Sequence, residues 1–214
     1  MGVVIEKVDL LVAEALRELE ELTELRKRKI RERGIDFYSP NKMQLKAHQS
    51  KARTIIYSGG NRSGKSTFGV TELTFHLTRQ YPKWFSEKRR FKRTIKAAIS
   101  ATRFGTIETV IEPKIREFLP KDYYKISRNN RYLSRIICKD GSTVDILTLE
   151  MSNEAYESAD WDFVWEDEPQ GQRKREGLIR GLVDRRGLEV ITFTPLTEAW
   201  MKEELIDKAD GKRI

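Results

Sequence analysis

The sequence predicts an α/β protein with a mostly parallel central sheet. Short runs rich in β-branched and apolar residues alternate with helical segments along most of the chain, which is typical of strand–helix–strand units. A glycine-rich loop joins the first of these strands to the next helix, and a later apolar strand ends in a pair of acidic residues. The alternation predicts the fold class, and the two loops indicate where a functional site forms.

The predicted elements follow one another in a simple order. An N-terminal helix is expected over residues 8–33, where leucines recur at helical spacing among balanced charges, and Gly34 provides a stop signal. We interpret it as a packing or partner helix, so residues 1–36 form a helical extension and residues 37–214 form one domain. The other expected elements are strands at 54–58, 94–100, 162–165 and 188–193, helices at 65–77, 107–118 and 177–183, and a β-hairpin made of 133–138 and 143–149.

The composition is that of a basic globular protein. No apolar run among the 214 residues is long enough to cross a bilayer, and the N-terminus lacks the pattern of a secretory signal. The single cysteine, Cys138, cannot form an internal disulfide, so we expect a soluble cytoplasmic protein. The net charge of +8 favours a polyanion such as nucleic acid as partner, although a merely basic surface has the same composition.

Positive charge is concentrated between residues 79 and 103, where Glu87 is the lone acid. Trp84, Phe85 and Phe91 are interleaved with the cations. Such a stretch can contact a nucleic-acid backbone and its bases, or it can be a solvated loop whose aromatic residues anchor it to the core. Both interpretations remain open on the sequence alone.

The glycine-rich loop matches the phosphate-binding pattern G-x-x-x-x-G-K-S. Glycines let backbone N–H groups converge on phosphate oxygens, Lys65 places a cation near the β- and γ-phosphates, and the Ser66 hydroxyl can ligate Mg²⁺. The helix that begins here adds the positive end of its dipole. We therefore predict that the chain binds ATP through Gly59, Gly60, Asn61, Arg62, Ser63, Gly64, Lys65, Ser66 and Thr67.

The acidic pair provides the groups that a nucleotide hydrolase needs besides this loop. The strand at 162–165 carries Asp167 to the edge of the sheet, where its carboxylate could hold the Mg²⁺ shell. Glu168 could polarise the attacking water as a general base. A solvated acidic turn is the alternative, and the acid at Glu166 is unusual because an apolar residue is commoner there.

Four other polar residues are candidates for the same site. Arg62 could reach the γ-phosphate, or it could be a surface residue that caps the loop. Gln44 has the amide needed to read an adenine edge, or it could be an exposed polar residue on a helix. Thr192 and Thr194 follow the acidic pair in a later strand, where a hydroxyl could sense the γ-phosphate.

Together these residues resemble the ATPase domain of the large terminase subunit of tailed double-stranded DNA bacteriophages, over roughly residues 37–204. The loop arginine, the tryptophan before the acidic pair and a Thr-Phe-Thr-Pro-Leu run make the resemblance specific. The segments that carry it are Gly59-Gly60-Asn61-Arg62-Ser63-Gly64-Lys65-Ser66, Glu72, His76-Leu77-Thr78, Tyr81-Pro82, Val164-Trp165-Glu166-Asp167-Glu168-Pro169 and Thr192-Phe193-Thr194-Pro195-Leu196.

The resemblance implies a P-loop NTPase fold of the additional-strand, catalytic-glutamate type. It implies that ATP hydrolysis with Mg²⁺ drives double-stranded DNA into a capsid, in the cytoplasm of the infected bacterial host. The active form would be a homo-oligomeric ring on the portal protein, with the small terminase subunit as a further partner. By the same resemblance Asp167 is the metal acid, Glu168 the catalytic base, Arg62 a loop arginine acting within its own subunit, and Thr194 a residue that couples hydrolysis to movement.

Two departures from the family pattern bear on these expectations. Many relatives carry an arginine shortly before the acidic strand, where this chain has Asn153, so an arginine donated to a neighbouring subunit is unassigned. Arg180, Arg185 and Arg186 are the candidates. Large terminases also carry a C-terminal nuclease domain, and we expect this chain to lack it and its activity.

Three other functions remain as alternatives. Another P-loop nucleic-acid motor, such as a helicase, would share the phosphate loop but usually has two such cores. A nucleotide kinase would need a lid and an acceptor site but no activating glutamate. A nucleotide-gated DNA-binding adaptor would bind ATP without needing Glu168.

Overall fold

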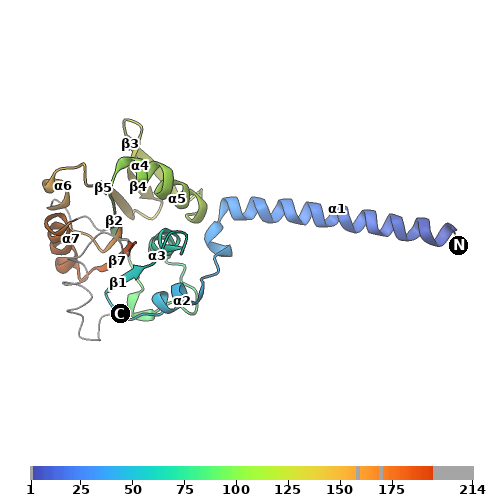
Figure 1. Ribbon diagram of the computed structural model, residues 1–214, viewed down its shortest axis with the longest axis horizontal. Helices are drawn as coiled ribbons and strands as arrows, with labels where there is room; N and C mark the ends of the chain where they lie inside the picture. The colour runs from blue at the N-terminus through green and yellow to red at the C-terminus, as the bar shows by residue number, and fades with distance from the viewer. Residues whose placement is uncertain (1, 158–159, 169–170, 195–214) are drawn as a thin grey trace.

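The core of the protein is a seven-stranded sheet, seen in a computed structural model that describes residues 2–157, 160–168 and 171–194 (Figure 1). The strands are β1 (Thr54–Ser58), β2 (Lys96–Ala101), β3 (Tyr124–Asn129), β4 (Tyr132–Cys138), β5 (Thr143–Thr148), β6 (Phe163–Asp167) and β7 (Leu188–Phe193). Their order is β1-β7-β6-β2-β5-β4-β3. Neighbours from β1 to β5 run parallel, whereas β4 and β3 are added antiparallel at one edge. The predicted mostly parallel sheet is confirmed.

The place of β7 in the sheet decides which loops meet. It lies between β1 and β6, with Phe193 opposite Ser58 and Thr192 opposite Asp167. Parallel strands end at the same edge, so the loop after β1, the acids at the end of β6 and Thr194 after β7 come together there. This inserted strand is the additional strand that the resemblance implies, and the P-loop NTPase fold is confirmed.

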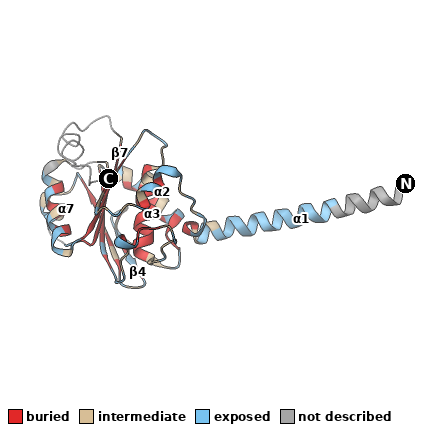
Figure 2. Ribbon diagram, turned by 90° about the horizontal axis from the view of Figure 1, so that it is seen from below, coloured by how far each residue is buried: buried red, intermediate tan, exposed pale blue. Residues whose placement is uncertain are grey.

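Helices cover both faces of the sheet. The helical elements are α1 (Gly2–Glu32), η1 (Gly34–Phe37), α2 (Lys42–His48), α3 (Lys65–Thr78), η2 (Glu87–Arg89), α4 (Phe104–Thr106), the π-helical turn η3 (Ile107–Ile111), α5 (Glu112–Phe118), α6 (Asn153–Glu157) and α7 (Gln172–Arg185). Buried residues of α3 and α5 pack with one face of the sheet, and those of α6 and α7 pack with the other. Figure 2 shows α7 on one side of the sheet and α3 on the other.

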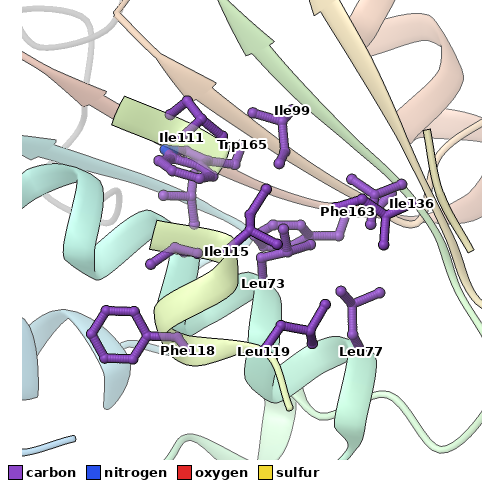
Figure 3. Packing of buried hydrophobic residues seen from close by; sticks show 14 of the residues in the cluster. Leu73, Leu77, Ile99, Ile111, Ile115, Phe118, Leu119, Ile136, Phe163 and Trp165 are labelled. Carbon is purple, nitrogen blue, oxygen red and sulfur yellow. The ribbon is translucent and has the colours of Figure 1, made fainter. Parts of the chain in front are cut away.

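The larger core cluster lies between the sheet and the helix pair α3 and α5. Leu73 of α3 and Ile115 of α5 meet Phe163 and Trp165 of β6, which are fully buried (Figure 3). Burial of such side chains contributes about 1.5–3 kcal/mol each, so this layer holds α3, and with it the phosphate loop, in a fixed position on the sheet.

Several elements differ from the sequence-based expectations. The hairpin of β4 and β5 is confirmed, but a third antiparallel strand, β3, was missed, because this edge strand is mostly exposed and polar and lacks an apolar pattern. Strand β2 begins at Lys96 rather than at residue 94, since Ile95 lies before the ladder. The short helices α2 and α6 were missed, and α7 is longer than residues 177–183.

The N-terminal helix extends away from the domain. In both views α1 projects as a single rod, joined to the rest of the protein at its C-terminal end (Figure 1). Its apolar residues Val12, Leu16, Leu19, Leu22 and Leu25 are exposed. No described helix has the length and apolar character to cross a membrane. Ile35 of η1 was assigned to the extension, yet it packs in the core of the domain.

Candidate active site

The conformation of the phosphate loop favours glycine at two positions. It follows β1 and ends at Gly64, whose backbone is left-handed (φ 85°). A Cβ on Gly64 would lie 2.7 Å from Gln44 Nε2, and one on Gly59 would lie 2.6 Å from Ser63 Oγ. The left-handed backbone favours glycine at Gly64, and a Cβ on Gly59 would displace the Ser63 hydroxyl, so the sequence pattern and the loop conformation agree.

Lys65 begins α3 and points back over this loop. Its Nζ donates to the carbonyl oxygens of Gly59 at 2.8 Å and Gly60 at 3.0 Å. The ammonium group is nearly buried and is held by the loop itself. Its position above the loop is the one that a phosphate-binding lysine needs, because a triphosphate seated on the loop would meet it directly.

Asp167 lies at the end of β6, within reach of the phosphate loop. The Ser66 hydroxyl donates to Asp167 Oδ1 at 3.1 Å, and the Thr192 hydroxyl donates to the same oxygen at 2.9 Å. Burial raises the pKa of the Asp167 carboxyl, and the neighbouring charge of Glu168 adds to this effect, while the two hydroxyl groups oppose it. The two predicted metal-binding side chains, Ser66 and Asp167, are therefore brought together.

A buried chain of hydrogen bonds orients Asp167. Trp165 Nε1 donates to the Thr192 hydroxyl at 2.9 Å, and that hydroxyl donates to Asp167. The tryptophan ring lies against Gly69 of α3, where an added Cβ would come within 2.1 Å of it. Thr192 is fully buried and engaged with Asp167. The sequence analysis singles out Trp165 and Thr192, but it does not predict that together they position the Asp167 carboxylate.

Glu168 is held in a strained and specific position. Its backbone is left-handed (φ 68°), which is uncommon for a residue with a side chain. The Thr194 N–H donates to both carboxylate oxygens at 3.1 Å, and the Thr194 hydroxyl donates to Oε1 at 3.1 Å. The structure thus brings the predicted base and the predicted coupling residue into direct contact.

The remaining loop candidates are placed differently. Arg62 and Asn61 are exposed, and Arg62 has a left-handed backbone (φ 63°). Gln44 of α2 is buried: its Nε2 donates to the Gly64 carbonyl at 3.1 Å, and its Oε1 accepts from the Asn41 N–H at 2.9 Å. The amide therefore braces the phosphate loop, and an adenine contact would require it to exchange these bonds.

A groove adjoins the phosphate loop on the side of α2. It has a volume of about 530 Å³ and lies between α2 and β1. Its walls include Lys46, Ala47, Ile56 and Tyr57, and it reaches Ser63 of the loop. A largely apolar groove next to a phosphate-binding loop has the character of a site for a nucleotide base.

Glu166, the unexpected acid, faces the other side of the sheet. It is fully buried, and Arg175 of α7 places Nε 3.7 Å from Glu166 Oε1. The same guanidinium donates to Glu189 Oε1 at 2.8 Å and to Oε2 at 3.0 Å. A buried arginine on α7 thus accounts for an acid where an apolar residue is commoner.

The arginine candidates for a neighbouring subunit lie away from this edge. Arg185 and Arg186 end α7, which leads into the N-terminal end of β7, so they lie at the opposite edge of the sheet from the phosphate loop. Arg185 NH1 lies 3.5 Å from Asp162 Oδ1. Arg180 is exposed on α7. None of the three meets the site within its own chain, and their role toward a neighbour stays a prediction.

A buried polar cluster fixes α2 and the basic segment onto α3. Glu72 of α3 is fully buried and accepts from Arg89 at 3.1 and 2.8 Å. His48 Nδ1 lies 2.6 Å and His76 Nε2 3.3 Å from the same carboxylate. Because His48 ends α2 and Gln44 on that helix braces the loop, the cluster supports the site from behind. In the sequence, Glu72 and His76 stand out only because they belong to the segments that resemble the terminase family.

The basic segment uses its aromatic residues for packing. Phe85 is buried, and the rings of Trp84 and Phe85 lie 5.2 and 5.9 Å from the His48 ring. These aromatic residues therefore anchor the segment to the core, as expected if residues 79–103 form a solvated loop held by its aromatic side chains. Lys83 and Lys88 are exposed, and their contact with nucleic acid stays a prediction.

Comparison with known proteins agrees with this geometry. The family model described as terminase large subunit, T4-like-virus type, N-terminal, matches residues 56–213. No curated protein matches the chain.

Solved structures of large terminases share the fold. The ATPase domain of the large terminase of Thermus phage P74-26 superposes with a TM-score of 0.59 at 19% identity, covering 78% of this chain and 69% of that one. The large terminase of thermophilic bacteriophage D6E gives a TM-score of 0.54 at 19% identity and covers 82% of this chain. A structure of the D6E protein with ATP-γ-S gives 0.50 at 19% identity, over 80% of this chain and 42% of that one.

This chain spans only 44% of the D6E large terminase. The family match covers most of the chain, from the second half of β1 through the phosphate loop, the acidic strand and β7. The chain therefore belongs to the family of the N-terminal domain of terminase large subunits of the T4-like-virus type.

Proposed function

We propose that this chain is the ATPase motor domain of a terminase large subunit and hydrolyses ATP to drive double-stranded DNA into a viral capsid. One observation carries the proposal: Lys65, Ser66, Asp167 and Glu168 converge at the carboxyl edge of one sheet. A phosphate loop, a metal acid and a placed carboxylate are the parts that nucleotide hydrolysis requires. Membership of the terminase family supports DNA packaging as the work performed.

The phosphates of ATP would bind over the loop. Lys65 would exchange the carbonyl oxygens of Gly59 and Gly60 for the β- and γ-phosphates. Ser66 and Asp167 fit Mg²⁺, because a hydroxyl and a carboxylate oxygen lie 3.1 Å apart and this ion prefers oxygen ligands completed by water and phosphate. When bound, Mg²⁺ neutralises charge on the phosphates. The base would occupy the groove between α2 and β1, and Gln44 would have to exchange its bonds to Asn41 and Gly64 to contact the edge of the base.

Glu168 would orient and deprotonate the attacking water. Its carboxylate is held by the N–H and hydroxyl of Thr194, and a carboxylate is the type of acceptor that can take a proton from water. Since Thr194 touches the base directly, a shift of Thr194 would move Glu168. This supports Thr194 as the residue that couples hydrolysis to movement. Arg62 would stabilise the charge that develops on the γ-phosphate from within the same subunit.

The larger assembly follows from the family and belongs to this proposal. The chain would work as a homo-oligomeric ring on a portal protein, with the small terminase subunit as partner, in the cytoplasm of the infected host. Slow hydrolysis by isolated chains, rising on assembly, is the expected behaviour. The nuclease function of a large terminase is not part of the activity proposed for this chain.

The substitution Glu168→Gln tests the proposal. It keeps the size of the side chain and removes the base, so turnover should fall by about 100-fold or more while ATP affinity stays within a few-fold of wild type. Phosphate release with and without double-stranded DNA, together with calorimetric titration of Mg·ATP, measures both. Lys65→Ala is the control that should lose binding.

The outcomes separate the alternatives. Turnover unchanged by Glu168→Gln would favour a nucleotide-gated adaptor, and transfer of phosphate to a nucleoside would favour a kinase. Stimulation by single-stranded rather than double-stranded DNA would favour a helicase-like motor. Wild-type protein that binds no nucleotide would contradict the proposal altogether.

A further inference from the structure

A lysine from a different helix approaches the phosphate loop. Lys114 lies on α5, and its Nζ donates to the Thr67 hydroxyl at 2.9 Å. Thr67 directly follows Lys65 and Ser66 at the start of α3. Glu112, the acid at the start of α5, is held by Arg116 and Arg128. No ion pair joins Lys114 to a carboxylate in the described part of the chain, so its charge is directed at the loop.

A π-helical turn sets this direction. The helical segment from Phe104 to Phe118 contains the π-helical residues Ile107–Ile111. One extra residue in a helix rotates everything after it by about 100°. Ile111, the last residue of the turn, and Ile115 of α5 are buried in the core cluster that includes Leu73 of α3 (Figure 3), and Lys114 precedes Ile115 at the border of this buried face. π-Helical turns inside α-helices are frequent at functional sites.

The surroundings of Lys114 favour an anion. The first three N–H groups of α3, those of residues 65–67, meet no backbone carbonyl in the described part of the chain, whereas the Phe68 N–H bonds to Gly64 O at 2.9 Å. The positive end of the helix dipole is therefore open beside a second cation. An ammonium group placed there repels the helix end unless a negative charge lies between them.

We propose that Lys114 is a second phosphate-binding cation of the nucleotide site, contacting the α-phosphate. The inference rests on the proposed ATPase function. Loop amides cradle the α- and β-phosphates while Lys65 reaches the β- and γ-phosphates. A cation at Thr67, two residues beyond Lys65, is therefore assigned to the α-phosphate, which ATP and ADP both carry. Lys114 thus positions the nucleotide in both states and makes no contact with the γ-phosphate.

The test compares nucleotide affinity with turnover. Lys114→Met keeps the length of the side chain and removes its charge, so the dissociation constants of Mg·ADP and Mg·ATP-γ-S should rise together by about tenfold, while kcat at saturating ATP stays within twofold. Lys114→Arg should restore most of the affinity. Lys121→Met, at an exposed lysine shortly after α5, is the matched control and should bind like wild type.

Two results would overturn the inference while leaving the ATPase proposal intact. One is a Lys114→Met protein that binds both nucleotides within twofold of wild type. The other is a Thr67→Val protein with the same loss, to which Lys114→Met adds nothing, because Lys114 would then act only by holding the threonine. Failure of the wild-type protein to bind any nucleotide would instead refute the proposed function. Thermal unfolding of each variant confirms that it is folded.

Discussion

At the scale of single residues, the site depends on a close approach between a glycine and an aromatic ring. Trp165 lies against Gly69 and orients Asp167 through the buried Thr192 hydroxyl. This arrangement explains why a tryptophan precedes the acidic pair. Its ring packs against Gly69 of α3, and its indole N–H donates a hydrogen bond to the buried Thr192 hydroxyl. One side chain thus serves both packing and the geometry of the metal acid.

Gly69→Ala tests this arrangement. A Cβ at this position would lie 2.1 Å from the tryptophan ring, so the ring must move, and we expect a loss of about 1–3 kcal/mol in unfolding free energy. Turnover should fall as well, because Asp167 loses its orientation. Urea unfolding and phosphate release provide the measurements. Gly105→Ala is the control: in the described part of the chain no atom outside its own helix backbone and chain neighbours lies within 4 Å of the added Cβ, and stability should stay the same or rise slightly. Equal stability of the two variants would contradict the account.

Some residues of the site could be predicted from the sequence because their chemistry is local. The phosphate loop needs specific residue types within eight consecutive positions, and the structure gives Gly64 a positive φ and Lys65 a place above the loop, as that pattern predicts. Thr192 and Lys114 could not be assigned in this way. The role of Thr192 depends on the pairing of β7 with β6, and that of Lys114 depends on the rotation of α5 after the π-helical turn. Neither feature can be predicted from the residues nearby in the sequence.

At the scale of elements, the ion cluster under β6 joins α7 to the sheet. Arg175 faces two acids, Glu166 on β6 and Glu189 on β7, and all three side chains are buried. A buried cation between two strands and a helix contributes little net stability, but removing it leaves the two carboxylates without their shared counter-charge. The cluster therefore matters most when it is broken.

Arg175→Met should lower the unfolding free energy by about 3–5 kcal/mol, because the acids lose this cation in a buried site. Chemical denaturation measures the change. Arg173→Met, at an exposed position on the same helix, should change stability by no more than about 0.5 kcal/mol. If the two substitutions cost the same, the buried cluster does not have the structural role assigned to it.

Elements with strong periodicity were predicted well, and those set by tertiary context were not. Strand β1 and strand β7 occur at the predicted residues, because apolar β-branched runs identify buried parallel strands. Strand β3 carries few apolar residues, since it is exposed at the sheet edge and its pairing with β4 alone defines it. Helix α2 has only seven residues, and its Asn41 cap and packing, rather than its own pattern, determine it.

At the scale of the whole molecule, the cluster around Glu72 links stability to pH. Burial in an apolar environment lowers the pKa of His76 below 6.5, with Glu72 opposing this effect. Burial alone would raise the pKa of Glu72, but Arg89, His48 and His76 outweigh it and hold it well below 4.5. For both groups the folded protein takes up its proton less readily than the unfolded chain does.

Stability should therefore fall as the pH decreases. The contribution of His76 is fully present above pH 6.5, the usual imidazole pKa, and is lost as the pH falls toward its lower folded pKa, while that of Glu72 is lost only below pH 4.5. Urea unfolding at pH 7.5, 6.5 and 5.5 covers the range in which the histidine titrates, and the His76 variant separates its contribution from that of Asp167, whose raised pKa acts in the opposite direction. His76→Gln should flatten the dependence in this window. A wild-type unfolding free energy that is constant between pH 7.5 and 5.5 would show the assignment to be wrong.

The whole-molecule view also separates the projecting helix from the domain. The exposed leucines of α1 make no contribution to the core, whereas η1 places Ile35 inside it. Removal of residues 1–28 should then leave Mg·ATP binding unchanged and alter the unfolding free energy by no more than about 0.5 kcal/mol. Removal of residues 1–38 also deletes Ile35 and the Tyr38 hydroxyl that lies 3.0 Å from His48 Nε2, so it should cost about 2–5 kcal/mol. Calorimetric unfolding of the two truncated proteins measures both effects. Equal losses of unfolding free energy in the two proteins would place the start of the domain within α1. The expected difference between them places it between residues 28 and 35. The leucine face of α1 would then have no role in the stability of the isolated chain.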